Sequence, residues 1–390
     1  MSANRDNIER NLADEEIEAP DAKKSDAKKS DASLERVALL AEVQRLSLPS
    51  LESIRRADTP AKVPVFAELL YPGAWLIVGR PKIGKSWLLL QMTLAAADGG
   101  QLLGYQATAA VEVLYVAAED DDARIKSRLE ALGVANAPTG VHVINFQMLR
   151  ALAGRYADGL TFIEFLSGWL DQHPKVRMVL LDTETTCRQI WAAEMQEPGT
   201  SRITETDYRQ TRDFDDLALR RQIVIGLVNH AAKRKGEWVD IHELINRSNT
   251  ALAGCSGSIA LADPPDVDQL QSENRMRVLG IRGRDLKDDI LIAVRQREDM
   301  PYFENLGTYQ EVKQSEAEAE ILEALEELMQ DAPVEAYVTN ADLAEALSKK
   351  QGTVKRAISR MLKANHTRWK RYRLKVKRGK GGGVRLEVVA

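Results

Sequence analysis

The sequence of 390 residues has few cysteines and lacks long apolar runs. Its two cysteines, Cys187 and Cys255, are too few for a disulfide framework or a cysteine-based zinc site, and they fit reduced structural thiols. No run of 18 apolar residues occurs, so we expect no transmembrane helix and no membrane partner. The first twenty residues are polar and acidic, so we expect no secretory signal peptide. Together these absences favour a cytoplasmic protein.

The charge of the chain is distributed unevenly. The formal net charge is −4. Residues 349–380 contain fourteen Lys or Arg residues and no Asp or Glu, and residues 349–390 together carry +14, which leaves −18 for the rest of the chain. Clustered positive charge commonly neutralises the phosphates of a nucleic acid. The sequence therefore predicts a DNA-binding segment near its carboxyl end.

The amino-terminal part of the chain does not have the pattern of a packed domain. Residues 1–33 lack hydrophobic periodicity and repeat the five residues Asp-Ala-Lys-Lys-Ser, so we expect a disordered tail. Residues 34–65 predict a short amphipathic helix that ends near Leu46, followed by a linker that three prolines interrupt.

Residues 66–313 alternate short apolar runs with helical stretches, which is typical of a parallel sheet covered on both faces. The predicted strands are 75–78, 111–118, 141–146, 176–181, 223–228, 258–262, 277–281 and 290–295. The predicted helices are 86–97, 124–132, 160–172 and 212–221. We expect the polar stretch 186–212 to be a long mobile connection. The predicted fold class is α/β with a mainly parallel twisted sheet.

Residues 314–390 show another pattern, which predicts a small winged helix-turn-helix domain. Thr339 or Asn340 is expected to cap the second of three helices, and Thr353 the third. The predicted helices are 316–329, 341–347 and 353–362, and the predicted hairpin strands are 371–377 and 384–389.

The most specific motif is a glycine-rich loop that fits G-x-x-x-x-G-K-[ST] between a predicted strand and a predicted helix. Its glycines let backbone N–H groups approach phosphate oxygens, Lys85 would reach the β- and γ-phosphates, and the Ser86 hydroxyl would bind Mg²⁺. The residues predicted to bind ATP are Gly79, Arg80, Pro81, Lys82, Ile83, Gly84, Lys85, Ser86 and Trp87.

Acidic residues follow two of the predicted strands. Asp182 ends an apolar strand and would support Mg²⁺ together with Ser86, although an Asp at this position can also cap a helix. Glu119 follows another strand, at the carboxyl edge of the sheet where ligands of open α/β sheets bind. Either Glu119 or Glu184 could position the water that attacks the nucleotide.

A polar pair, Asn229 and His230, closes the strand 223–228. A histidine at this edge can sense the γ-phosphate of the nucleotide and transmit its loss. The alternative is a loop histidine with no such role.

The basic residues near the carboxyl end fall on the predicted third helix and on the predicted wing. A helix for the major groove and a wing for the backbone form a workable arrangement for binding duplex DNA. The expected core of so small a domain favours a packing role for Trp369 and Tyr372. The residues predicted to bind DNA are Lys355, Arg356, Arg360, Lys363, Arg371, Arg373, Lys375, Lys377 and Arg378.

The order of these motifs over about residues 66–300 resembles the RecA-fold ATPases of the plasmid RepA hexameric helicase type, which are related more distantly to DnaB helicases. The resemblance implies that Glu119 is the catalytic glutamate, that Asp182 is the Walker B aspartate and that His230 is the phosphate sensor. It also implies a homo-oligomer, a hexamer, with ATP at the subunit interfaces. The motifs are, in order, the Gly79–Ser86 loop, Ala117-Ala-Glu119-Asp120, Asp182-Thr183, Asn229-His230, Gly257-Ser258 and Gly283-Arg284-Asp285.

Two segments matter for this resemblance. The RepA type places an arginine finger where this chain reads Asp263-Pro-Pro-Asp266, and Arg282, Arg284 and Lys287 are substitutes to consider. The stretch 233–247 lies where RecA-type folds place a DNA-facing loop, which would contact single-stranded DNA, but it also fits a solvated basic loop.

The sequence thus predicts an ATP-dependent DNA-binding motor of a mobile element, a RepA-like replicative helicase ATPase. The missing finger and the acidic core favour a second hypothesis, a nucleotide-switched DNA-binding regulator or loader that does not unwind processively. A third, a small-molecule kinase with an appended repressor module, is less well supported because the core shows no lid-like arginine cluster.

Overall fold

The computed structural model describes residues 36, 39, 41–194, 203–230, 241, 249–264, 276–330, 336–363, 372–377 and 383–388. The chain divides into two compact units, residues 1–61 and residues 62–390. The predicted disordered tail, residues 1–33, lies outside the described residues.

The first unit is helical where it is described. Residues 41–45 lie in a helix, within the stretch predicted to be helical. A second helix, α2 (Leu51–Arg56), begins after Ser50, whose hydroxyl accepts a hydrogen bond from the backbone N–H of Ser53 at 3.1 Å. None of the α2 residues is buried.

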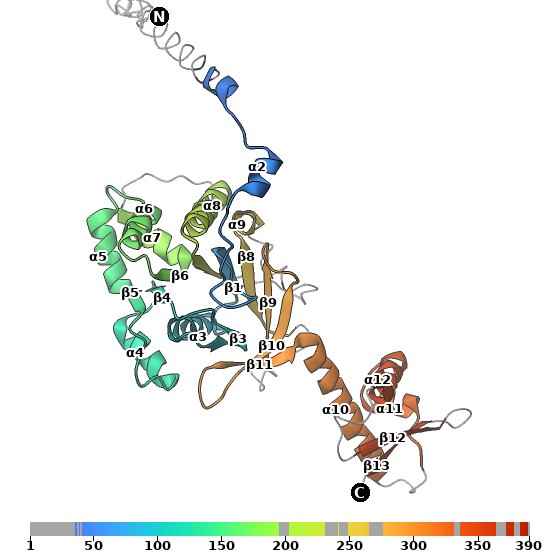
Figure 1. Cartoon of the computed structure of the whole chain (residues 1–390). Coiled ribbons are helices and arrows are strands. Elements are labelled where there is room, and N and C mark those ends of the chain that lie inside the picture. Colours follow the sequence, from blue (N-terminus) through green and yellow to red (C-terminus); the bar gives the residue numbers. More distant parts are fainter. Residues whose placement is uncertain are drawn as a thin grey trace, which may run out of the picture. The chain divides into compact units, whose positions relative to one another are not determined.

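The second unit contains a large sheet in which nine of the described strands follow the order β11-β10-β9-β8-β1-β7-β6-β4-β5 (Figure 1). The strands β5, β4, β6, β7, β1 and β8 run parallel, whereas β9, β10 and β11 extend the sheet antiparallel. The predicted α/β class with a mainly parallel sheet is therefore confirmed. The nine strands are β1 (Gly73–Gly79), β4 (Glu112–Ala117), β5 (Val141–Asn145), β6 (Val176–Asp182), β7 (Val224–His230), β8 (Gly257–Ala262), β9 (Met276–Gly283), β10 (Ile290–Gln296) and β11 (Phe303–Thr308).

Helices cover both faces of this sheet. Alternate residues of each buried strand point to opposite faces, so each strand contributes to a core on either side. In β1, Leu76 belongs to the core that includes residues of α5 to α8, whereas Ile77 belongs to the core that includes residues of α3. A short hairpin, β2 (Gln101–Leu102) and β3 (Tyr105–Gln106), follows α3. The helices are α3 (Lys85–Asp98), α4 (Asp122–Ala131), α5 (Phe146–Tyr156), α6 (Phe162–Asp171), α7 (Glu184–Glu194), α8 (Ile203–Arg221) and α9 (Asn249–Gly254).

The prediction of a mobile connection over residues 186–212 is wrong for most of its length. This stretch contains the rest of α7 and the beginning of α8, and only residues 195–202 lie outside the described part of the chain. Cys187 and Trp191, four residues apart on α7, are buried in the core under the sheet. Apolar residues at this spacing stabilise a helix even when its other positions are polar.

The carboxyl-terminal elements have a core of their own, built from Ile321, Leu325, Leu343, Ile358, Val384 and their neighbours. Thr339 caps α11 as predicted, in a capping box with Asp342. Thr353 does not cap α12, because this helix already begins at Gln351. The elements are α10 (Tyr309–Gln330), α11 (Asn340–Ala346), α12 (Gln351–Lys363), β12 (Tyr372–Lys377) and β13 (Gly383–Val388), so residue 314 lies inside α10.

Both cysteines lie in the interior of the second unit. Cys187 and Cys255 are both buried, no disulfide joins them, and burial raises the pKa of Cys255 to about 12. None of the described helices is both long and apolar enough to cross a membrane.

Candidate nucleotide-binding site

The register of the parallel strands brings the predicted motifs to one edge of the sheet. Gly79, the last residue of β1, pairs with His230, the last residue of β7. Ala117, at the end of β4, pairs with Asp182, at the end of β6, and Glu119 follows two residues later. Because β7 lies between β1 and β6, the predicted phosphate loop, the predicted metal ligand and the predicted sensor share the carboxyl edge of the sheet.

The loop between β1 and α3 has a backbone that suits an anion. Gly84 directly precedes α3 and has a φ of 109°. Because glycine has no side chain to cap the helix, it leaves the N–H groups of the first turn to other acceptors, such as an anion. A Cβ atom on Gly84 would lie 2.8 Å from Cζ of Phe303, so this position requires glycine for space as well as for its backbone angle.

Lys85 lies inside this loop, with 6% of its side chain exposed. Its ammonium group donates hydrogen bonds to the carbonyl oxygens of Gly79 at 2.8 Å and Arg80 at 3.2 Å. Burial lowers the pKa of Lys85, and the nearby carboxylates of Asp182 and Glu119 act in the opposite direction. The loop thus folds around a lysine whose charge lies next to the two carboxylates predicted from the sequence.

Asp182 and Ser86, the two predicted magnesium ligands, are in direct contact. The buried carboxylate of Asp182 accepts hydrogen bonds from the Ser86 hydroxyl and, at 3.1 Å, from the Tyr115 hydroxyl. Burial raises the pKa of Asp182, and burial together with Asp182 raises the pKa of Tyr115 well above its ordinary value. The peptide bond between Asp182 and Thr183 is cis.

This pair fits a magnesium ion that is held mainly by substrate. The described residues contain no group of three or more His, Cys, Asp or Glu side chains that could hold a metal by themselves. Mg²⁺ is usually bound by one or two protein ligands together with phosphates and water. A hydroxyl and a buried carboxylate beside a phosphate loop match that requirement, and the positive charge would offset the burial of Asp182.

The two glutamates that could position a water molecule have different surroundings. Glu119 is exposed at the sheet edge, and its Oε1 accepts hydrogen bonds from the hydroxyls of Thr183 at 3.1 Å and Thr186 at 2.9 Å. Glu184 is 1% exposed and forms an ion pair with Arg188, with Nε and Oε1 separated by 2.5 Å. The geometry therefore favours Glu119 over Glu184 as the residue that meets a solvent molecule.

The predicted sensor pair is described only in part. Asn229, at the end of β7, accepts a hydrogen bond through Oδ1 from the Thr185 hydroxyl at 2.7 Å. The backbone of His230 is part of β7, but its side chain lies outside the described residues. For His230, the structure therefore adds the position of its backbone, which pairs with that of Gly79.

Sequence reasoning missed an ion-pair network beside the P-loop. Asp120, directly after Glu119, is 4% exposed, contacts Arg128 and lies 3.5 Å from Arg124. The guanidinium of Arg128 lies over the ring of Trp87, at 5.6 Å from its centroid. The predicted nucleotide residue Trp87 therefore packs against α4. In the sequence, the one signal of this network is the spacing of four residues between Asp120 and Arg124.

Arg80, another predicted nucleotide residue, is held by Asp263, which directly follows β8, the neighbour of β1 on the side away from β7. Its guanidinium donates a hydrogen bond to Oδ1 of Asp263 at 3.1 Å, and Arg277 lies 3.2 Å from the same oxygen. The side chains of Pro81 and Lys82 are exposed, whereas Ile83 is buried in the core.

The considered substitutes for an arginine finger lie away from the P-loop of their own chain. Gly283 pairs with Gly257, which pairs with Trp75 near the beginning of β1, so Arg282 and Arg284 lie toward the opposite edge of the sheet from Gly79. Arg282 forms an ion pair with Asp289 at 2.6 Å, and Arg284 lies 3.8 Å from the buried Asp215. The basic stretch 233–247 lies outside the described residues except for Ile241.

The predicted DNA-binding side chains on α12 share one face. Lys355, Arg356 and Arg360 are exposed, while Val354, Ala357 and Ile358 are buried. On β12, Lys375 and Lys377 are exposed as well. The side chains of Lys363 and Arg373 are not described, and Arg371, Arg378 and Trp369 lie outside the described residues.

Sequence reasoning also missed Tyr337 in this part of the chain. Its ring lies 5.7 Å from the ammonium of Lys377 and 5.5 Å from the guanidinium of Arg385, so it steadies two cations of the hairpin. Its neighbour Val338 pairs with Val384 of β13.

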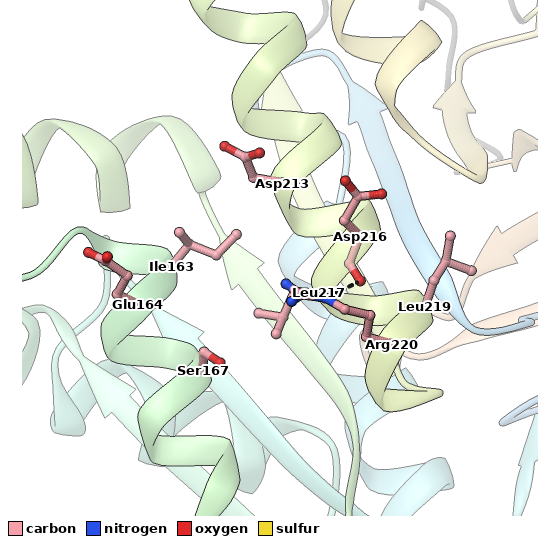
Figure 2. Close-up of a pocket in the computed structure, with 8 residues that line it drawn as sticks. All are labelled: Ile163, Glu164, Ser167, Asp213, Asp216, Leu217, Leu219 and Arg220. Atoms are coloured by element: carbon pink, nitrogen blue, oxygen red, sulfur yellow. Dashed lines mark hydrogen bonds between the residues drawn. The ribbon is translucent and has the colours of Figure 1, made fainter. Parts of the chain in front are cut away.

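A separate pocket lies between α6 and α8 (Figure 2). Glu164 on α6 and Asp213 and Asp216 on α8 make it acidic, and burial together with Asp216 raises the pKa of Asp213. Arg220 donates a hydrogen bond to the backbone oxygen of Asp216 at 3.2 Å. This pocket contains none of the residues that the motifs single out.

Comparisons with known proteins place the described site within a matched domain. A family model described as an AAA domain matches residues 42–236, half of the chain. A solved structure described as the crystal structure of the RadB recombinase is 15% identical over 60% of this chain and 92% of that chain, with a TM-score of 0.36. A second solved structure, described as an ATPase domain, is 14% identical over 71% of this chain and 98% of that chain, with a TM-score of 0.43. No curated protein matches the sequence.

Proposed function

The chain belongs to the AAA domain family, and from this we infer that it is a Mg²⁺-dependent ATPase. From the resemblance of its motifs and from its basic carboxyl-terminal segment we propose that it is a DNA-binding motor of the RepA-like replicative helicase type, encoded by a mobile element. One observation carries this proposal. The P-loop, the Ser86–Asp182 pair and the exposed Glu119 lie together at one edge of the sheet.

The P-loop residues bind and orient the nucleotide in this proposal. The uncapped amino end of α3 and the charge of Lys85 favour the phosphates, and Lys85 exchanges its backbone carbonyl partners for phosphate oxygens. Ser86 and Asp182 hold Mg²⁺, which when bound neutralises charge on the phosphates.

Glu119 orients the attacking water and accepts its proton. The side chain is exposed, so a water molecule can reach it, and its charge lies near that of Lys85. His230, at the end of the strand beside the P-loop strand, couples hydrolysis to the DNA-facing segments. The stretch 233–247 contacts single-stranded DNA, and this step rests on the resemblance in sequence.

The carboxyl-terminal elements form a winged helix domain that recruits the ATPase to duplex DNA. Its third helix, α12, presents Lys355, Arg356 and Arg360 to solvent on the side opposite its buried residues. The hairpin β12–β13 presents Lys375 and Lys377 and serves as the wing. Exposed cations on a helix and a hairpin neutralise backbone phosphates on both sides of a groove.

The functional assembly is a homo-oligomer, a hexamer, with ATP at the subunit interfaces. This part of the proposal follows from the resemblance to the RepA type, and so does its helicase activity.

A second function, a nucleotide-switched DNA-binding regulator or loader, is favoured by a specific observation. The RepA-type position for an arginine finger reads Asp263-Pro-Pro-Asp266, and Asp263 instead holds Arg80 and Arg277. Without a finger the transition-state charge is less stabilised, which gives slow hydrolysis.

One set of assays separates the two functions. ATP hydrolysis is measured alone, with single-stranded DNA and with duplex DNA, and strand displacement is measured on a forked substrate. Stimulated hydrolysis with displacement supports the helicase, whereas DNA binding with slow, unstimulated hydrolysis supports the regulator. A protein that neither hydrolyses nor binds ATP would overturn both.

A further inference from the structure

The first turn of α7 contacts both of the strand ends that carry the proposed chemistry. Thr183 and Thr186 reach Glu119 after β4, and Thr185 reaches Asn229 at the end of β7. Thr183 is part of the Asp182-Thr183 motif, but the sequence predicts no role for its side chain or for Thr185 and Thr186, and the proposed function does not use them. The hydroxyl groups of Thr183 and Thr186 donate hydrogen bonds to Glu119.

The contacts with Glu119 converge on one of its two oxygens. The Thr183 hydroxyl lies 3.1 Å and the Thr186 hydroxyl 2.9 Å from Oε1. The two hydroxyl oxygens are themselves 2.8 Å apart, and the Thr183 oxygen also accepts a hydrogen bond from the backbone N–H of Thr186 at 3.3 Å. Since each hydroxyl has one proton, both protons can serve Oε1 while the Thr183 oxygen accepts from the backbone.

This arrangement fixes the direction of the carboxylate. Thr183 is 2% exposed and caps the first turn of α7, so its position is set by the helix. Two donors on Oε1 hold the side chain of Glu119 in one orientation although the residue is exposed. The other oxygen, Oε2, has no hydrogen-bond partner among the described residues, so it remains available to accept a proton from water.

We propose that Thr183 and Thr186 are positioning residues that hold Glu119 through Oε1, so that Oε2 meets the attacking water of ATP hydrolysis. The inference rests on the proposed function, because it gives these threonines a role only if Glu119 acts in hydrolysis. A held carboxylate accelerates the reaction, since orientation is established before the water reacts.

The test replaces Thr186, because Thr183 also caps the helix. Thr186→Val keeps the shape and removes the hydroxyl, whereas Thr186→Ser keeps the hydroxyl. We expect kcat for ATP to fall about tenfold in Thr186→Val, as one hydrogen bond to a charged group is lost. We expect KM for ATP and the melting temperature to stay unchanged and Thr186→Ser to restore most of kcat. Thr93→Val, the same chemical change at a buried hydroxyl of α3, is the matched control and should leave kcat as it is.

A second comparison shows whether Thr186 acts through Glu119. In a Glu119→Gln background, Thr186→Val should have no further effect on the residual rate. A wild-type protein that hydrolyses ATP while Thr186→Val keeps its full kcat overturns the positioning role alone. Additive losses in the double variant also overturn it, whereas a wild-type protein without ATPase activity overturns the proposed function and this role together.

Discussion

Replacing Gln91 with methionine should weaken the support of the P-loop from behind. Gln91 lies on α3, is 1% exposed, and pairs with the backbone of Phe303 through two hydrogen bonds. Its amide donates to the carbonyl oxygen of Phe303 at 2.9 Å and accepts from the N–H of Phe303 at 3.0 Å. Because β11 is an end strand in the strand order, this amide satisfies backbone groups that no neighbouring strand satisfies.

The cost of the substitution follows from these two hydrogen bonds. Methionine has a similar length but no amide, so the N–H and C=O of the buried Phe303 would both lose their partners. Each buried group left unpaired costs about 1–3 kcal/mol, so we expect the free energy of unfolding to fall by about 2–6 kcal/mol. Since 1 kcal/mol shifts Tm by about 2–4 °C in domains of 150–250 residues, thermal unfolding should begin at least about 4 °C lower.

The same variant should bind ATP more weakly, because the ring of Phe303 lies against Gly84. The measurements are thermal unfolding and the Kd of a fluorescent ATP analogue. Gln189→Met, on the exposed side of α7, is the matched control and should change neither. An unchanged Tm together with an unchanged Kd in Gln91→Met would refute the reasoning that the edge of β11 supports the P-loop.

Four further outcomes are expected. Lys85→Ala should abolish ATP turnover yet keep duplex binding, measured by fluorescence anisotropy. Loss of both would contradict the proposal that ATP and duplex DNA bind to separate parts of the chain. Replacing the three exposed basic residues of α12 with alanine should reduce the slope of log K against log salt by about 1 for each phosphate contact, and an unchanged slope would remove α12 from the DNA interface. Burial raises the pKa of Asp182, so the folded state holds its proton more tightly than the unfolded state and loses stability as pH rises above the ordinary aspartate range. Asp182→Asn should therefore raise Tm at neutral pH, with a gain that shrinks below about pH 4, and a lowered Tm at pH 7 would contradict this. Thr93→Val should stabilise the fold by about 1 kcal/mol in thermal unfolding, since the buried hydroxyl of Thr93 has no hydrogen-bond partner among the described residues, and a loss of stability would count against that assignment.

The strands that carry the site could be predicted because each is a continuous apolar run. β1, β6 and β7 are buried on both faces, and this leaves a signal within the sequence of each strand. Other elements left none. In β11 only Phe303 is buried, so its sequence shows no alternation of apolar and polar residues. α5 buries only Leu149 and Ala153 and follows directly on β5, so nothing in the sequence separates the helix from the strand. Such elements depend on neighbours distant in the chain.

The candidate site divides in the same way. The P-loop is predicted because phosphate binding needs one local backbone and one lysine, which a short motif encodes. Tyr115, Arg128 and Thr186 could not be predicted, because each meets its carboxylate partner only when separate strands and helices come together. The roles of Glu119, Asp182 and His230 in catalysis stay predictions.

The contact between Phe303 and Gly84 also bears on how such chains can be recombined in evolution. β11 ends at Thr308 and α10 begins at Tyr309, so the strand that supports the P-loop is continuous with the first of the carboxyl-terminal helices. An exchange of carboxyl-terminal domains between relatives would leave the ATPase intact only if the crossover fell after β11. A crossover before Phe303 would bring in a strand that had not evolved together with this P-loop. The exchange would then alter ATP binding even if the new segment never contacted the nucleotide.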